Sequence, residues 1–281
     1  MTRRNNTLLN IKSIYPSFKP AERRVADYVL RNPKRVVHVS ITELAKAAKV
    51  SDATVVKFCK RLGYQGFQEF KILLAQDVVV RHTLVDGQLE QGDDPRTIKE
   101  KVFRANMNAL QDTTQVLDDR ALEQAVDALV QAREIHFYGL GSSGIVALDG
   151  EQKFSRIGRL ASAFVDAHMQ ITRAILLEPG DVAIGLSHSG ETREIAEALE
   201  TARECGATTI AITNHSSSSV AKIADLVLLT SGRGSLFSKE GIASRITQLA
   251  TIDALFAAVA LADLERSQEV LDKTTRILSQ R

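Results

Sequence analysis

The sequence predicts an all-α domain followed by an α/β domain with a doubly wound parallel sheet, on three observations. The 281 residues exceed the usual domain size of about 100 to 200 residues. Residues 1–82 carry sixteen Lys or Arg against six Asp or Glu, a net charge of +10; the remainder carries −8 and the whole chain +2. From residue 98 onward, short β-branched runs alternate with helical stretches. We therefore expect domains at 1–80 and 98–281, joined by a linker at 81–97.

The composition is that of a globular chain, with 44% hydrophobic and 25% charged residues. Cys59 and Cys205 are far apart in sequence, so they form neither a disulfide framework nor a metal-ligand cluster, and they suit a reducing compartment. The first fifteen residues do not resemble a signal peptide. The longest apolar tract, 255–262, is far shorter than the roughly 20 residues that cross a bilayer. We expect a cytoplasmic protein with no membrane partner, no metal and no cofactor.

Three helix starts are predicted in the basic part of the chain. Pro20 suits the first position of a helix, which Pro33 should end. Ser40 is expected to cap the next helix, with Glu43 as its capping-box partner. After a brief turn, Ser51 can cap a further helix. The second and third of these helices are short and closely joined.

The helix after Ser51 has a distinct inner and outer face. Its apolar residues follow the i, i+3, i+4, i+7 pattern of a buried stripe, and Gly63 is placed to end it; the stripe comprises Val55, Phe58, Cys59 and Leu62. This position makes Cys59 a core residue rather than a redox switch. The outer face comprises Ser51, Asp52, Ala53, Thr54, Lys57, Lys60 and Arg61.

Two short helices joined in this way form a helix-turn-helix arrangement, in which the start of the second helix reads base edges in the major groove and its cations meet phosphates. Together with the net charge of +10, the pattern predicts binding to a double-stranded DNA operator. The alternative is a helical bundle with a solvated, charged surface.

The acidic part of the chain follows the polar linker 81–97, which contains Gly, Asp and Pro. Helices are expected at 98–117 and 120–132. Five strand-like runs then alternate with helices: EIHFYGLGSSG, ASAFVDAH, DVAIGLSHSGET, TTIAITNHSSSS and LVLLTSGRG. This alternation favours a parallel, doubly wound sheet, in which ligands bind beyond the carboxyl ends of the strands.

Two of these strands end in turns that contain serine and glycine and lead into helices. The turn from Gly139 to Gly144 satisfies G-x-G-x-x-G, and Asp166 lies 22 residues beyond it, which allows a dinucleotide site. The second turn, 187–192, reads SHSGET. Hydroxyls and backbone N–H groups at a helix N-terminus form a cradle for phosphate. Two such turns in one sheet favour a small phosphorylated ligand; the alternative is that the serines only cap helices.

At these motifs the chain resembles the RpiR family of bacterial transcription regulators, which join a helix-turn-helix domain to a sugar isomerase (SIS) domain of flavodoxin-like fold. The resemblance spans about residues 10–275 and rests on SDATVVKFCKRLGYQGFQEFK, HFYGLGSSGIVALDGEQKF, SHSGETREI with AITN, and GIASRITQLATIDALF, in this order. It implies DNA binding by the helix that begins near Ser51, and a helical oligomer interface, hence a homodimer or homotetramer.

The same resemblance implies that the serine-rich turns bind a phosphosugar through Ser143, Ser187, Ser189 and Thr192, with Ser142 as a neighbour. His188 occupies a variable position of the second turn. The sugar-facing residues are not fixed by the motifs, and the candidates are Asp166, His168, Glu240 and Arg245.

Three functions are compatible with these features. We expect a DNA-binding regulator whose operator binding is modulated by a phosphorylated sugar, which would shift the helices at 98–132 and thereby the half-site spacing. One alternative is a repressor that senses NAD(H) through the turn from Gly139 to Gly144. The other is a phosphosugar isomerase, which needs a general base. Candidate bases are Glu191, Glu240, His168 and His188, but nothing singles out an acid/base pair, so a non-catalytic sensor is favoured.

Overall fold

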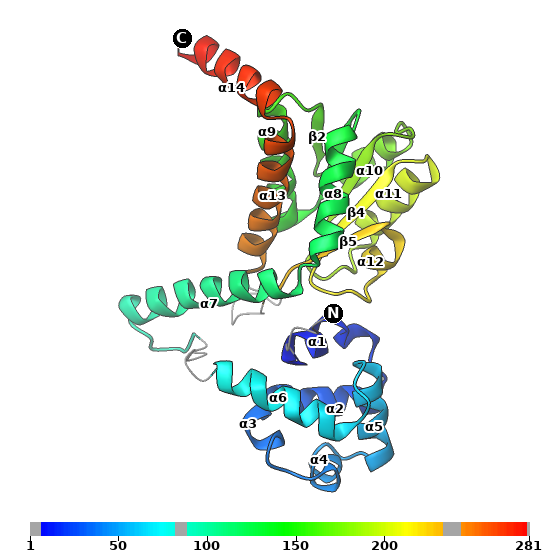
Figure 1. Cartoon of the computed structure of the whole chain (residues 1–281), viewed down its shortest axis with the longest axis vertical. Helices are drawn as coiled ribbons and strands as arrows, with labels where there is room; N and C mark the ends of the chain where they lie inside the picture. Colours follow the sequence, from blue (N-terminus) through cyan, green and yellow to red (C-terminus); the bar gives the residue numbers. More distant parts are fainter. Residues whose placement is uncertain (1–6, 82–88, 233–242, 280–281) are drawn as a thin grey trace. The chain divides into compact units, whose positions relative to one another are not determined.

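The computed structural model describes residues 7–81, 89–232 and 243–279 (Figure 1). The chain divides into two compact units, Met1–Gly87 and Gln88–Arg281.

The first unit is helical, as predicted. Its elements are α1 (Thr7–Ser13), a 3-10 turn η1 (Tyr15–Ser17), α2 (Pro20–Arg31), α3 (Pro33–Val36), α4 (Ile41–Ala47), α5 (Asp52–Arg61) and α6 (Phe67–Arg81). The expected caps are present, because the Ser40 and Ser51 hydroxyls accept from the N–H groups of Glu43 and Thr54. All four residues of the predicted α5 stripe are buried, with Phe58 packed between the rings of Phe18 and Phe70 at 5.2 and 5.8 Å.

The second unit contains a five-stranded parallel sheet of order β2-β1-β3-β4-β5, which is the doubly wound, flavodoxin-like order. Its strands are β1 (Ile135–Gly139), β2 (Ala161–Phe164), β3 (Val182–Leu186), β4 (Thr208–Thr213) and β5 (Leu226–Leu229). The five predicted strand runs are therefore confirmed.

Helices cover both faces of this sheet. The helices described in this unit are α7 (Pro95–Val116), α8 (Asp119–Gln131), α9 (Gly141–Arg156), α10 (Ala167–Ala174), α11 (Arg193–Glu204), α12 (Ser219–Ile223), α13 (Ala243–Ala262) and α14 (Leu264–Leu278). One apolar core joins the sheet to α8, α9 and α13, and a second core joins it to α10, α11 and α12.

Helix α7 begins inside the segment expected to be a linker. The Asp94 carboxylate accepts from the N–H of Thr97 at 2.7 Å, and Pro95 occupies the first helical position. Residues 95–97 are therefore helical, and the helix predicted at 98–117 starts three residues earlier than expected.

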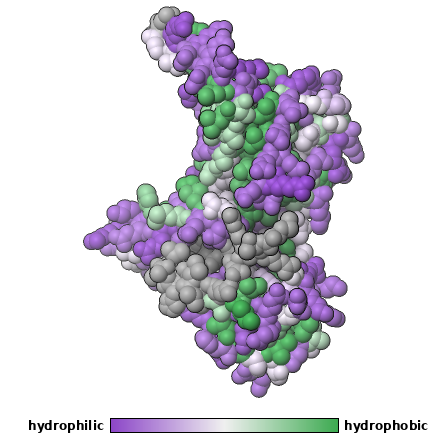
Figure 2. Space-filling model, in the orientation of Figure 1, coloured by the Kyte–Doolittle hydropathy of each residue, from purple (hydrophilic) through white to green (hydrophobic). Residues whose placement is uncertain are grey.

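Helix α13 is long and apolar enough, over Ser244–Ala262, to cross a membrane by length and composition. Its residues Ile252, Leu255 and Val259 are nevertheless fully buried in the core beside the sheet. Apolar side chains remain at the surface along this helix (Figure 2), including Leu261. We conclude that α13 is a core helix of the second unit.

The position of Cys59 in the core of the first unit generates a prediction about its reactivity. Burial raises the pKa of the Cys59 thiol to about 12, so it stays protonated near neutral pH, whereas Cys205 is partly exposed. Iodoacetamide at pH 8 should therefore alkylate Cys205 but not Cys59 in the native protein, as measured by peptide mass spectrometry. Unfolding in guanidinium should make both cysteines reactive. Equal labelling of both in the native state would contradict the burial of Cys59.

Candidate functional site

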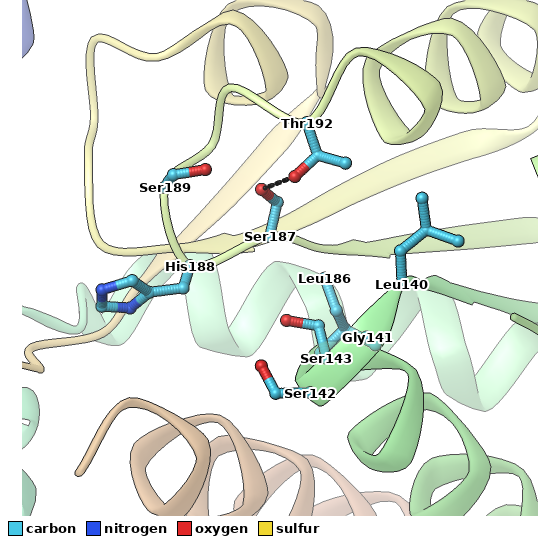
Figure 3. A pocket seen from close by; sticks show the side chains of 9 residues that line it. All are labelled: Leu140, Gly141, Ser142, Ser143, Leu186, Ser187, His188, Ser189 and Thr192. Atoms are coloured by element: carbon cyan, nitrogen blue, oxygen red, sulfur yellow. Dashed lines mark hydrogen bonds between the residues drawn. The ribbon is translucent and has the colours of Figure 1, made fainter. Parts of the chain in front are cut away.

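The two serine-bearing turns lie side by side at the carboxyl edge of the sheet. β1 pairs with β3 in parallel, and Gly139 stands opposite Leu186. The turns that follow these residues surround one hollow of about 110 Å³ (Figure 3). It is lined by Leu140, Gly141, Ser142, Ser143, Leu186, Ser187, His188, Ser189 and Thr192. All five predicted phosphosugar-binding residues are among them.

The turn between β1 and α9 depends on glycine at two positions. A Cβ on Gly139 would lie 2.5 Å from the carbonyl oxygen of Ser143, so only glycine lets the chain turn this tightly. Gly141 has a φ of +55°, in the left-handed region. As a result Ser143 is buried in the pocket wall, with its hydroxyl donating to Oε1 of Gln248 at 3.2 Å, while Ser142 is exposed.

The turn between β3 and α11 is held by its own hydroxyls. The Ser187 and Thr192 hydroxyl oxygens lie 2.8 Å apart and share a hydrogen bond (Figure 3). Ser187 Oγ also accepts from the N–H of Gly190 at 3.0 Å, and Ser189 Oγ accepts from the N–H of Glu191 at 3.2 Å. The hydroxyls are thus fixed in place around the pocket.

The two helices that begin at the pocket differ in how they start from four other helices of this unit. Helices α7, α8, α10 and α12 each begin at an Asp or Ser whose side chain accepts from a backbone N–H of the first turn. Helices α9 and α11 begin at Leu140 and Thr192, and neither has a side-chain cap. No serine of the two turns is therefore the side-chain cap of α9 or α11. Helix N-termini without side-chain caps attract anions.

The chemistry of the pocket suits a phosphate-sized anion. Its described lining contains hydroxyls, backbone amides and His188, and no Lys, Arg, Asp or Glu. Hydroxyl and amide donors at two helix N-termini stabilise negative charge without a cation. The volume is well below the roughly 300 Å³ or more of a pocket that encloses a whole ligand.

Of the other candidate residues, His188 lines the pocket, whereas Asp166, His168, Arg245 and Glu191 do not. Asp166 caps α10, accepting from the N–H of Met169 at 3.0 Å, and His168 and Arg245 are exposed. Glu191 accepts from the hydroxyl of Ser219 at 2.6 Å. Glu240 lies outside the described residues. No cluster of His, Cys, Asp or Glu suited to a metal occurs in the described parts of the chain.

A buried histidine lies on β1, outside the pocket lining. His136 is fully buried and bonds to the Tyr138 hydroxyl at 3.0 Å and to a Glu134 carboxylate oxygen at 2.7 Å. Burial lowers the pKa of this histidine. It acts as a core residue rather than as a base for a pocket ligand.

A chain of hydrogen bonds that the sequence did not indicate leads from the pocket to α7. The N–H of Asn214 donates to the carbonyl of His188 at 3.1 Å, and Asn214 Oδ1 accepts from the Thr230 hydroxyl at 2.6 Å. The next residue, Ser231, donates its N–H to the Thr113 hydroxyl of α7 at 3.0 Å. Asn214 ends the AITN motif, which was the only sequence signal for this connection.

In the first unit, α4 and α5 form the predicted helix-turn-helix. The Thr42 hydroxyl donates to the Asp52 carboxylate at 2.9 Å and so ties the two helices together. Lys57 and Lys60 are exposed on the outer face. The seven predicted DNA-binding residues share this face: Ser51, Asp52, Ala53, Lys57, Lys60 and Arg61 are exposed and Thr54 is half-buried.

Arg61 differs from the other cations of this face because its guanidinium has partners within the unit. It donates to the Glu22 carboxylate at 3.0 Å and to the carbonyl of Ser17 at 2.6 Å, and it lies over the ring of Phe18. Arg61 thus anchors the end of α5 to the rest of the first unit.

Comparison with known proteins assigns each of the two units to a known domain family. The family model for the helix-turn-helix domain of the rpiR family matches residues 5–80, and the SIS domain model matches residues 128–258. An HTH-type transcriptional regulator of Caldanaerobacter subterraneus is 41% identical over 276 residues, 98% of each chain. HexR of Pseudomonas aeruginosa, also an HTH-type transcriptional regulator, is 37% identical over 256 residues, 91% of this chain and 90% of its own.

Among solved structures, the Vibrio vulnificus NanR protein complexed with ManNAc-6P has 27% sequence identity and a TM-score of 0.63, with 98% of each chain covered. The two matched domains and these relatives identify the class of protein. It is an HTH-type transcriptional regulator with a SIS domain, the phosphosugar-binding domain of this class. The chain belongs to the RpiR family.

The close packing of the second turn generates a prediction for Gly190. This residue has a φ of +67°, and a Cβ there would lie 2.1 Å from the hydroxyl oxygen of Ser218, which caps α12. Gly180 also has a positive φ, +95°, but a Cβ there would meet nothing within 4 Å. Both alanine variants carry left-handed strain of about 1 kcal/mol, but only Gly190→Ala must also displace Ser218.

Thermal unfolding followed by circular dichroism should therefore give a melting temperature several degrees lower for Gly190→Ala than for Gly180→Ala, since about 1 kcal/mol corresponds to roughly 2–4 °C in a domain of this size. Equal melting temperatures would show that Ser218 yields freely and that the turn is not tightly packed.

Proposed function

We propose that this protein is a transcriptional regulator in which the pocket between the two serine-bearing turns binds a phosphorylated sugar, and that this ligand modulates binding of α5 to a DNA operator. The observation that carries the proposal is the meeting of two helix N-termini without side-chain caps and the five predicted hydroxyls around one hollow. NanR, in its complex with ManNAc-6P, is a related protein with such a ligand, which supports the same class of effector here.

The route from ligand to DNA runs through α7. This helix follows the segment that joins the two units, and its Thr113 is hydrogen-bonded through Ser231 to the network that reaches His188 in the pocket wall. A ligand that binds more tightly to one arrangement of this network than to another shifts the population of α7 positions, and the difference in affinity sets the size of the response.

A binding role is favoured over catalysis of sugar isomerisation. An isomerase needs a base beside the sugar carbons. Of the described candidate bases, Glu191 is engaged with Ser219 and His168 is exposed and does not line the pocket. His188 lines it, but no Asp, Glu, Lys or Arg of the described lining is there to form an acid/base pair with it. The related HTH-type proteins from Caldanaerobacter and Pseudomonas are described as regulators. NAD(H) binding is also less favoured, because the turn itself requires Gly139 and Gly141, and Asp166 caps α10.

The regulator is proposed to act in the cytoplasm as a homodimer or homotetramer. Operators with two half-sites require paired recognition helices. Exposed apolar side chains on the second unit, Ile145 and Leu148 on α9 and Leu261 on α13, support self-association.

Ser189→Ala tests the effector site. Loss of a hydroxyl that donates to a charged phosphate should weaken the ligand about tenfold or more, because such bonds contribute about 1.5–3 kcal/mol. Operator binding should be followed by fluorescence anisotropy while phosphosugars, ManNAc-6P among them, are titrated. Ser155→Ala, an exposed serine on α9 away from the pocket, is the control. An unchanged response to the effector in Ser189→Ala would refute the site.

Lys57→Ala combined with Lys60→Ala tests the DNA-binding face. If both cations meet phosphates, operator affinity should fall and the slope of log K against log salt should shrink by about 2, one unit per lost contact. The measurement is a salt titration of anisotropy. Lys222→Ala, an exposed lysine on α12 in the second unit, should leave the slope unchanged. Identical slopes for the double variant and the unaltered protein would rule out this face.

A further inference from the structure

Gln248, on α13, has a polar atom with no partner directly behind the pocket. The residue is 2% exposed, and its side-chain Oε1 accepts the hydrogen bond from Ser143. Its side-chain Nε2 is buried and has no hydrogen-bond partner among the described residues. Buried amide donors are rarely left unpaired, so such an atom requires an explanation.

The hydrogen bond between Ser143 and Gln248 conflicts with the role proposed for Ser143. A serine hydroxyl carries one proton, and here that proton is donated to Gln248 Oε1. An ionised phosphate oxygen only accepts hydrogen bonds. Ser143 can therefore donate to a bound phosphate only if Gln248 stops accepting from it.

We propose that Gln248 is a positioning residue that sets the direction of the Ser143 hydroxyl, an inference that rests on the proposed phosphosugar site. A half-turn of the side-chain amide exchanges Oε1 and Nε2. Nε2 then donates to Ser143 Oγ and the Ser143 proton turns to the phosphate, while Oε1 moves to the position that Nε2 occupied and gives up its bond from Ser143. Binding of the phosphate and reorientation of the amide are thus coupled.

This coupling has two consequences. The site favours groups that only accept hydrogen bonds, such as a phosphate, over a neutral sugar hydroxyl that could donate to Ser143. It also makes α13 respond to occupancy of the pocket, because Gln248 belongs to that helix. α13 packs against both α9, which carries Ser143, and α7.

A double-mutant cycle on the full-length protein tests the inference, with inorganic phosphate as the probe and dissociation constants measured by ³¹P NMR titration. Gln248→Met keeps the side-chain volume and removes both polar atoms. This variant should raise the dissociation constant for phosphate about three- to tenfold when Ser143 is present, which is the effect of one hydrogen bond. In the Ser143→Ala background it should have no effect, because Gln248 acts only through Ser143.

A matched control is provided by Gln170, which is also fully buried and donates through Nε2 to the carbonyls of Phe164 and Gly139 at 2.8 and 3.2 Å. Any effect of Gln170→Met on phosphate affinity should be the same with and without Ser143. If Gln248→Met does not fold, Gln248→Glu replaces it. The carboxylate that this second variant introduces only accepts hydrogen bonds. It should therefore weaken phosphate binding more when Ser143 is present than in the Ser143→Ala background.

The possible results distinguish the positioning role of Gln248 from the proposed phosphosugar site. Equal effects of Gln248→Met in both backgrounds would overturn the positioning role and leave a packing role, while a phosphate affinity that still depends on Ser189 would preserve the proposed function. If the unaltered protein does not bind phosphate at all, both the proposed site and this inference are wrong.

Discussion

The parallel pairing of β1 with β3 is the constraint on which the site depends. It ends with Gly139 opposite Leu186, so the two turns that follow leave the sheet at the same height and next to each other. In this fold a strand-order reversal occurs where β1 lies between β2 and β3, and such switch points form crevices. The hydroxyls therefore converge although the two turns are more than forty residues apart in sequence.

The distribution of charge sets different requirements for the anion-binding sites proposed in the two units. The first part of the chain, with its net charge of +10, can attract a polyanion over a distance. The remainder carries −8, and the described pocket lining has no Lys or Arg. Affinity for a small anion there must come from oriented hydroxyls and backbone N–H groups, whose effect is confined to the first helical turn.

Features that depend on neighbouring residues could be predicted from the sequence, and features that depend on the tertiary fold could not. The caps at Ser40 and Ser51, the buried stripe of α5 and the five strands follow from local spacing and are confirmed. The contacts of Gln248 with Ser143 and of Thr113 with Ser231 join residues 105 and 118 positions apart. No periodic pattern carries such information, and the ion pair of Arg61 with Glu22 was missed for the same reason.

The anchoring of α5 within its unit also bears on how relatives of this protein can diverge. Asp52, at the start of α5, bonds to Thr42 of α4. Arg61, at the end of α5, bonds to Glu22 and Ser17, so both ends of α5 are fixed by contacts within the first unit. The exposed residues between them, such as Ala53 and Lys57, do not make these contacts. These positions can therefore change among relatives while the contacts that hold the helix-turn-helix together are kept.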